Sequence, residues 1–131
     1  MTTPAASPTP VGLVLIAHGS PDPDWRRPLE RVAALLGERL GPDRVALAYL
    51  AHAPHLDDAL VELHAAGLRR VVVIAALLSP GGKHVKHDIP DAVAAARARF
   101  GDVEIELRGG ALGDDDEVVA ALAAASLRGL V

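Results

Sequence analysis

The sequence predicts a single α/β domain built on a four-stranded parallel sheet flanked by helices. Four short apolar runs alternate with four segments of helical periodicity along the 131 residues. Because strand and helix alternate, each strand should return parallel to the one before it through a right-handed crossover. Half of the residues are hydrophobic, which is enough for one core in a chain of this length.

The apolar runs predict the strands. They are residues 11–17, 44–50, 70–77 and 103–107. The first and third runs are apolar throughout, as is typical of central strands that are covered on both faces. The fourth run alternates apolar residues with Glu104 and Glu106, which indicates an edge strand with one face in water.

Helices are expected between the strands. Asp22 or Asp24 can cap the first one, and Pro28 predicts that its regular part starts between Trp25 and Pro28, because proline is tolerated only near the first turn. The later helices should cover about residues 55–66, 85–100 and 114–127. The positions expected to form the apolar faces are Leu29, Val32, Leu36 and Leu40 in the first helix and Leu56, Leu60 and Leu63 in the second.

Composition limits the functions that are open to the chain. Residues 1–10 are expected to form a flexible tail ahead of one domain over 11–131. The apolar run behind the tail is too short to span a bilayer and lacks signal-peptide flanks, which favours a soluble cytoplasmic protein without membrane partners. The formal net charge of −4 argues against nucleic-acid binding. Without cysteine, any metal must be held by His, Asp or Glu.

Five of the six histidines follow predicted strands. They are His18 after the first strand, His52 and His55 after the second, and His84 and His87 after the third. In open parallel sheets, ligands bind beyond the carboxyl ends of the strands. Neutral imidazole is a common ligand for divalent first-row metals, so this edge is a candidate metal site. The sixth, His64, lies in a predicted helix and is expected to be structural or solvated.

Several of these residues also have a plain structural interpretation. His55 is expected to start a helix, and His87 to lie on a solvated helix face. Asp88, four residues after His84, could orient that imidazole or serve as a helix-start carboxylate. Ser20 follows an HG pair without the G-x-S-x-G context of a nucleophile, so a cap or a hydrogen bond to a ligand is the favoured role.

The segment SPGGKHVK at 79–86 is glycine-rich and basic. Gly81 and Gly82 either turn the chain or expose backbone N–H groups at a helix N-terminus to a carboxylate or phosphate. Lys83 and Lys86 would add positive charge. The GxxxxGK[ST] spacing is missing, so the segment is not a P-loop.

Two longer motifs frame the predicted cleft, LIAHGSPDPD at 15–24 and VVVIAALLSPGGKHVKHDIP at 71–90. Together they resemble the small CbiX-type sirohydrochlorin chelatases, over about residues 11–127. The resemblance implies a flavodoxin-like chelatase half-unit that pairs as a homodimer. It also implies insertion of Co²⁺, Fe²⁺ or Ni²⁺ into sirohydrochlorin, a tetrapyrrole rich in carboxylates, without an organic cofactor. By motif position, His18 and His84 would handle the metal.

The sequence departs from the family pattern at three places. An acidic residue is common after the second strand, where this chain has YLAHAPH at 49–55, so His52 is a candidate third metal ligand. Pro21 stands where arginine is common after HGS, and His87 where asparagine or arginine is usual. Arg26 and Arg27, in addition to the two lysines, are further candidates for contacts with carboxylates.

The sequence therefore predicts a sirohydrochlorin cobaltochelatase in which His18 and His84 bind the metal and take up pyrrole protons. Ser20, Gly81, Gly82, Lys83 and Lys86 are the predicted substrate contacts. The same reaction with iron or nickel is the nearest alternative. A non-catalytic module that carries metal or tetrapyrrole, favoured by the missing acid, and a domain that binds an unrelated anion at SPGGK are alternatives of other classes.

Overall fold

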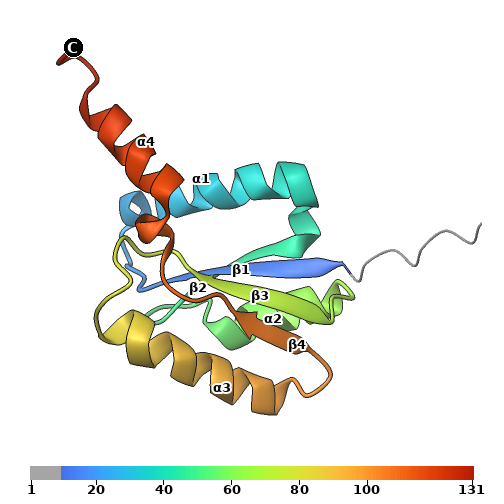
Figure 1. The fold of residues 1–131 in the computed structure, drawn as a ribbon. Helices are drawn as coiled ribbons and strands as arrows, with labels where there is room; N and C mark the ends of the chain where they lie inside the picture. Colours follow the sequence, from blue (N-terminus) through green and yellow to red (C-terminus); the bar gives the residue numbers. More distant parts are fainter. Residues whose placement is uncertain (1–9) are drawn as a thin grey trace, which may run out of the picture.

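A four-stranded parallel sheet lies at the centre of the computed structural model, which describes residues 10–131 (Figure 1). Its strands are β1 (Val11–Ala17), β2 (Val45–Tyr49), β3 (Arg70–Ala75) and β4 (Glu104–Leu107). The order β2-β1-β3-β4 confirms that the first and third strands are central and the fourth lies at an edge. The expected tail, Pro10 apart, lies outside the described residues.

The strand register brings three loops to one edge of the sheet. Ile16 of β1 pairs with Ala75 of β3, and Ala17 pairs with Tyr49 of β2. All pairs are parallel, so the segments that follow these strands leave the sheet side by side. The predicted clustering of histidine-bearing segments at the carboxyl edge is therefore confirmed at the level of the backbone.

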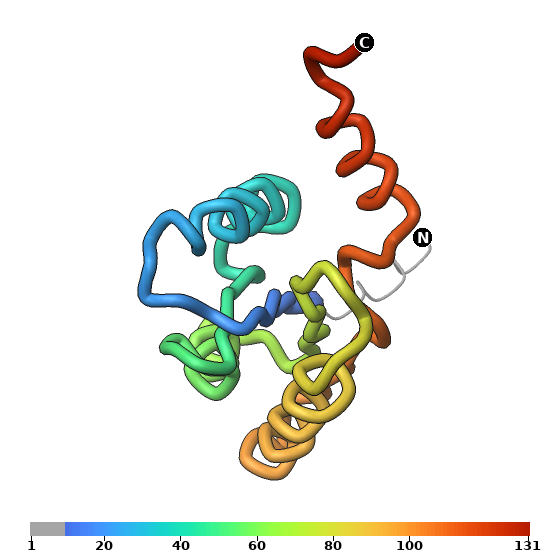
Figure 2. The backbone as a smooth tube through the Cα atoms, turned by 90° about the vertical axis from the view of Figure 1, so that its left-hand side faces the viewer, coloured from blue at the N-terminus to red at the C-terminus, as the bar shows by residue number. Residues whose placement is uncertain are grey.

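The structure has four α-helices: two cover one face of the sheet, one lies over the other face, and the last points away from the sheet (Figures 1 and 2). They are α1 (Pro23–Leu40), α2 (Leu56–Ala65), α3 (Ile89–Arg99) and α4 (Asp116–Ser126), with 3₁₀ turns at Pro42–Arg44 and Leu112–Asp114 and a π-helical turn at His84–Asp88. None of the helices in residues 10–131 has the length and apolar character needed to cross a bilayer.

The two faces of the sheet are covered unequally. Helices α2 and α3 bury apolar side chains against it, which confirms the predicted inward face of the second helix. The buried helix residues are Leu56, Ala59, Leu60 and Leu63 in α2 and Ile89, Val93 and Ala96 in α3. On the other face, neither α1 nor α4 contains a buried residue. The main core therefore sits between the sheet and α2/α3, whereas α1 covers the opposite face only in part, with Leu15 and Ile74 buried and Leu13 and Val72 partly exposed.

The starts of three helices differ from the prediction. Helix α1 begins at Pro23, earlier than expected, because the Asp22 side chain accepts the N–H of Asp24 and proline suits the first helical position. Pro28 then lies inside the helix, which tolerates the absence of one backbone hydrogen bond because proline has no N–H to donate. Helix α4 begins at Asp116, later than expected, because residues 112–114 form a 3₁₀ turn. A π-helical turn replaces the expected first turn of α3.

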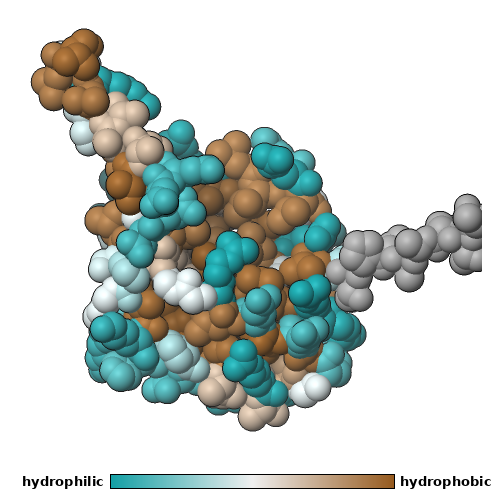
Figure 3. All heavy atoms as spheres, in the orientation of Figure 1, coloured by the Kyte–Doolittle hydropathy of each residue, from teal (hydrophilic) through white to brown (hydrophobic). Residues whose placement is uncertain are grey.

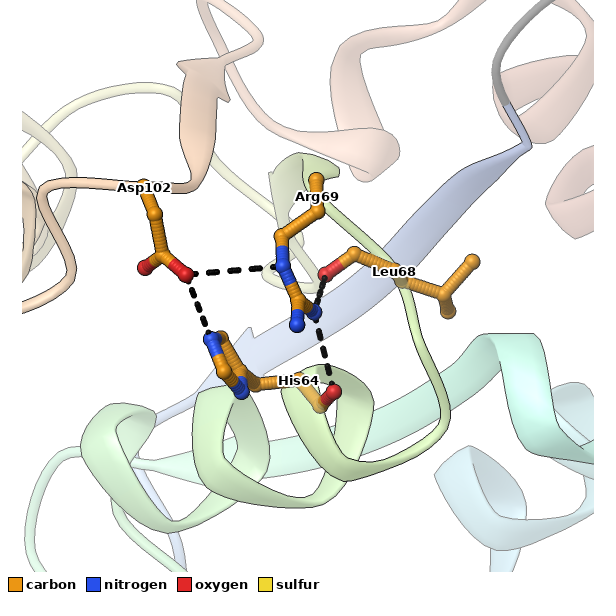
Figure 4. Close-up of polar contacts among 4 residues, drawn as sticks. All are labelled: His64, Leu68, Arg69 and Asp102. Atoms are coloured by element: carbon orange, nitrogen blue, oxygen red, sulfur yellow. Dashed lines mark hydrogen bonds and ion pairs between the residues drawn. The ribbon is translucent and has the colours of Figure 1, made fainter.

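A polar cluster at the other edge of the sheet ties α2 to the segment before β4 (Figure 4). The Nε2 atom of His64 lies 2.8 Å from the Asp102 carboxylate, and Nε of Arg69 lies 3.4 Å from the same oxygen. Arg69 also donates to the carbonyls of His64 and Leu68. The hydrogen bond from His64 holds the pKa of the Asp102 carboxyl below its usual value, with the Arg69 charge adding to the effect. His64 therefore has the structural role that was expected.

Replacing Asp102 with asparagine tests this cluster through its pH dependence. A carboxyl whose pKa is lower in the folded state stabilises the fold above its ordinary pKa of about 3.9, and this contribution is lost as the pH falls further. We expect the Asp102→Asn variant to be less stable than the unmodified protein at pH 7, and the difference to shrink below about pH 3. Urea unfolding at pH 7 and below about pH 3 measures this difference in the free energy of unfolding.

The control is Glu106→Gln on β4, an exposed carboxylate for which no ion pair is found within residues 10–131. Its effect on stability should depend little on pH. An equal loss at both pH values for Asp102→Asn would contradict the role given to the cluster.

Candidate functional site

His18 and His84 lie against each other at the carboxyl edge of the sheet. Their ring centroids are 4.6 Å apart and the ring planes meet at 39°. His18 follows β1 directly and is exposed, and His84 opens the π-helical turn with its side chain half-exposed. Two accessible imidazoles at this spacing can bind a metal ion or exchange protons with a bound molecule.

Asp88 orients the His84 ring. Its Oδ2 lies 2.8 Å from Nδ1 of His84, one turn along the chain. An ionised carboxylate only accepts hydrogen bonds, so Nδ1 carries the proton and Nε2 keeps its lone pair for a metal or an incoming proton. Of the two roles that the sequence left open for Asp88, the orienting contact is the one present.

The π-helical turn that carries His84 is the feature that sequence reasoning missed. The N–H of Ile89 bonds to the carbonyl of His84, one residue further than in an α-helix. Pro90 follows in the first turn of α3 and has no N–H to offer, which helps break the α-helical pattern. Such turns recur at functional sites, but periodicity within so short a segment does not reveal them.

Gly19 permits the close packing of the first loop on the second. It has a φ of 98°, and a Cβ placed there would lie 2.8 Å from Cβ of Tyr49 and 3.2 Å from Cδ2 of His52. Only glycine fits this contact and this backbone conformation. The half-buried His52 is thereby packed against the turn that carries His18. Within residues 10–131, however, no group of three or more His, Asp and Glu side chains is arranged to hold a metal ion.

Comparison with known proteins identifies the family and the fold of the chain. The family model described as CbiX matches residues 12–128. The chain belongs to the CbiX family. A crystal structure from Marinobacter aquaeolei VT8, described as a candidate CbiX protein of cobalamin biosynthesis, is 25% identical, with a TM-score of 0.78 over 92% of this chain and 95% of that one. None of the curated proteins matches closely enough to count as a relative.

Two structures of SirB from Bacillus subtilis share the fold of this CbiX chain. The sirohydrochlorin chelatase SirB from subspecies spizizenii, in complex with cobalt, is 22% identical with a TM-score of 0.76, over 90% of this chain and 50% of that one. SirB with Fe³⁺ is 21% identical with a TM-score of 0.75, over 90% and 46%. The chain spans about half the length of SirB. The predicted chelatase half-unit fold is confirmed.

The glycine-rich segment of this CbiX chain is a tight turn. Gly82 has a φ of 91°, which favours glycine, and its carbonyl accepts the N–H of Lys86 at 3.1 Å. The N–H of Gly81 donates to Oγ of Ser79 at 3.2 Å. The structural interpretation of the glycines therefore holds, and the Gly81 N–H already has a partner within the protein.

Both lysines of the chain stand on this segment. Lys83 is highly exposed, with Nζ 4.0 Å from Oδ1 of Asp88, and Lys86 is exposed. An exposed contact at that distance holds an ammonium group weakly. The lysines are therefore able to turn toward a carboxylate bound near His84.

Ser20, His55 and His87 lie close to the site in other roles. Oγ of Ser20 accepts the N–H of Asp22 at 3.1 Å, which is the cap-like contact expected for it. His55 is the N-cap of α2, where its N–H donates to the Asp58 carboxylate at 2.8 Å. His87 is exposed. These positions agree with the structural roles foreseen for the two histidines.

An aromatic and charged cluster beside the His18 turn was not predicted. The rings of Trp25 and Tyr49 meet edge-on with centroids 6.3 Å apart. Burial raises the pKa of the Tyr49 hydroxyl, Glu30 raises it further, and Arg26 opposes both. Nε of Arg26 is buried and has no hydrogen-bond partner within the described residues. The sequence places Tyr49 within a strand and gives no sign of a functional role. Its position beside the His18 turn results from the packing of the two segments.

The contact of Asp88 with His84 can be tested by Asp88→Asn. The amide would no longer fix the His84 tautomer, and loss of such an outer partner typically weakens metal binding about 10–100-fold. We expect Co²⁺ affinity, measured by isothermal titration calorimetry, to fall within this range. Asp91→Asn, an exposed acid in the first turn of α3, is the matched control and should bind as the unmodified protein does. Unchanged affinity in Asp88→Asn would remove the orienting role.

Proposed function

We propose that the protein is a metal chelatase that inserts a divalent ion into sirohydrochlorin. The observation that carries this proposal is the open pair of His18 and His84, with centroids 4.6 Å apart, in a chain of the CbiX family. The description of SirB as a sirohydrochlorin chelatase supports the substrate.

The histidine pair suits both halves of the reaction. Insertion exchanges two pyrrole N–H protons for one metal ion, so the site must release a metal and accept protons. Imidazole has a pKa near neutrality when unperturbed and can do either. A closed set of four ligands would retain the metal, whereas an open pair can pass it on. His84, with Nδ1 held by Asp88, offers Nε2 for this exchange.

The surrounding loops are proposed to hold the carboxylates of the macrocycle. Lys83 and Lys86 supply the positive charge, and the turn at Gly81 and Gly82 allows the substrate to approach the backbone. Ser20 can add a hydrogen bond from its hydroxyl, whose oxygen already accepts from Asp22.

We propose Co²⁺ as the metal, with His52 as a third ligand in place of the acid that is common after the second strand. His52 packs against Gly19, the residue after His18, which places it on the loop beside the pair. Fe²⁺ and Ni²⁺ are the alternatives. SirB is described in complex with cobalt and with Fe³⁺, which supports cobalt and iron as candidates. Anaerobic turnover with the three ions in competition separates them. We also propose that the chain acts as a homodimer.

A non-catalytic carrier of metal or tetrapyrrole is the second candidate. The segment YLAHAPH at 49–55 has no acidic residue, and no three-ligand group is found within residues 10–131. A carrier would release at most one equivalent of metallated product per site, whereas a chelatase would turn over many times.

Substitution of His18 and His84 by alanine tests the proposal. Loss of the groups that take up protons and bind metal should lower the rate of Co²⁺ insertion by at least about 100-fold. The absorbance change of sirohydrochlorin follows the rate, and the fluorescence of Trp25, the single tryptophan, reports substrate binding independently. His87→Ala is the control and should keep the rate within about twofold. An unchanged rate in the double variant would refute the assignment.

Replacing Lys83 and Lys86 with alanine tests the carboxylate contacts. We expect kcat/KM for sirohydrochlorin to fall about five- to tenfold, mainly through KM, because exposed ion pairs are individually weak. High salt should reduce the difference by screening. Arg39→Ala is the cationic control, because Arg39 lies in the last turn of α1, at the end of that helix far from the His18 turn. A fall in kcat with KM unchanged would argue against a binding role.

A further inference from the structure

Two of the three aromatic residues of the chain meet beside the His18 turn. The rings of Trp25 and Tyr49 have centroids 6.3 Å apart and meet edge-on, with 64° between their planes. Tyr49 is almost fully buried, whereas Trp25 is 45% exposed. A large part of the indole surface is therefore open to solvent next to a ring that is fixed in the protein. Neither ring has a part in the chemistry proposed for His18 and His84.

Packing brings this aromatic pair to the edge of the sheet that carries the histidines. Tyr49 ends β2, and a Cβ at Gly19, the residue after His18, would lie 2.8 Å from Cβ of Tyr49. Trp25 lies in the first turn of α1, which begins at the same edge (Figures 1 and 2). Tyr49 thus connects the exposed indole to the turn of His18.

The indole also shares a hollow with both histidine-bearing segments. Trp25 lines an apolar hollow of about 420 Å³ together with Ala17, which directly precedes His18, and Leu77, which lies between β3 and His84. Figure 3 shows the apolar surface over α1 and the neighbouring sheet. An indole that adjoins both segments is well placed to contact a flat molecule bound at the histidine pair.

The next residue, Arg26, is a cation without a partner. It is half-buried, its Nε has no hydrogen-bond partner, and no ion pair of its guanidinium is found within residues 10–131. Burial and Glu30 raise the pKa of the Tyr49 hydroxyl and the Arg26 charge opposes them, so the guanidinium lies near the aromatic pair. Arg27, in contrast, is exposed and pairs with Asp24. Of the two arginines that the sequence offers for carboxylates, Arg26 is the one whose charge is unpaired among the described residues.

We infer that Trp25 and Arg26 form a substrate-binding subsite beside the histidine pair, in which the indole stacks on the tetrapyrrole and the guanidinium binds one of its carboxylates. The inference rests on the proposed chelatase function and deepens it. A conjugated macrocycle rich in carboxylates is complementary to an aromatic surface and to a cation that can donate two parallel hydrogen bonds. Arg26 on α1 and the lysines at 83 and 86 would hold the carboxylates from two different elements, which would orient the ring over the histidines.

Binding of sirohydrochlorin in the absence of metal tests the subsite apart from the insertion step, with the absorbance of the macrocycle as the signal. Trp25→Leu removes the aromatic ring and keeps an apolar side chain. We expect this change to raise the Kd about three- to tenfold, the usual effect of losing one aromatic contact. Trp25→Phe keeps a ring and should bind within about twofold of the unmodified protein.

The two neighbouring arginines give a matched pair of variants. Arg26→Gln removes the unpaired charge and should raise the Kd for sirohydrochlorin about tenfold, because a hydrogen bond from a charged donor is lost. Arg27→Gln removes a charge that is already paired with Asp24 and should change the Kd by less than about twofold. The inference is overturned if Trp25→Leu or Arg26→Gln binds as the unmodified protein does.

Two further measurements show whether these side chains act on the macrocycle itself. Co²⁺ affinity, from calorimetry, and the mass in sedimentation velocity should be the same in Trp25→Leu and Arg26→Gln as in the unmodified protein. A parallel loss of Co²⁺ affinity would mean that the variants disturb the histidine pair, and would overturn the inference. A change in mass would make the indole a contact between protein chains and would also overturn it.

Turnover separates this inference from the proposed function. An unmodified protein that inserts metal many times, with variants that bind sirohydrochlorin unchanged, would reject the subsite and leave the chelatase intact. Affinity that is lost in Trp25→Leu and Arg26→Gln, in a protein that yields at most one equivalent of product per site, would support the subsite and reject the chelatase.

Discussion

The parallel pairing of β1 with β3 is the constraint on which the rest of the molecule depends. Ile16 opposite Ala75 sets the register, and both residues are buried. Because a buried strand cannot slip by one residue without turning its apolar side chains to the wrong face, this register is strongly specified. The loops that carry His18 and His84 therefore leave the sheet at the same level, and two imidazoles distant in sequence come into contact.

The helices cover the two faces of the sheet unequally. Helices α2 and α3 complete a core that one chain can form, with Leu60, Leu63 and Val93 almost fully buried. On the opposite face α1 leaves apolar side chains such as Leu13 and Val72 partly exposed, so less apolar area is removed from water there. Helices α2 and α3 thus support the sheet, and the site at its edge, mainly from one side.

The histidines illustrate how environment decides role. His64 and His55 have ring or backbone partners within the protein, in a hydrogen bond with Asp102 and at the N-cap of α2. His84 is held on one nitrogen only, by Asp88, and His18 is exposed. A ring with one fixed and one open nitrogen is oriented and still reactive, which suits a ligand that must take up a metal ion and let it go.

The sequence by itself determined the strand count, the parallel topology, the central and edge strands, and the edge that carries the histidines, because burial on two faces and strand–helix alternation are written in local patterns. Only the tertiary structure decided the π-helical turn at His84, the early start of α1 and the cluster of Trp25, Tyr49 and Arg26. It also decided that α1 and α4 remain unburied. The aromatic cluster and the exposure of α1 and α4 depend on segments far apart in the chain, and hydrophobic periodicity says which face is apolar but not whether anything covers it. The π-helical turn and the start of α1 follow from local backbone and capping contacts that this periodicity does not report.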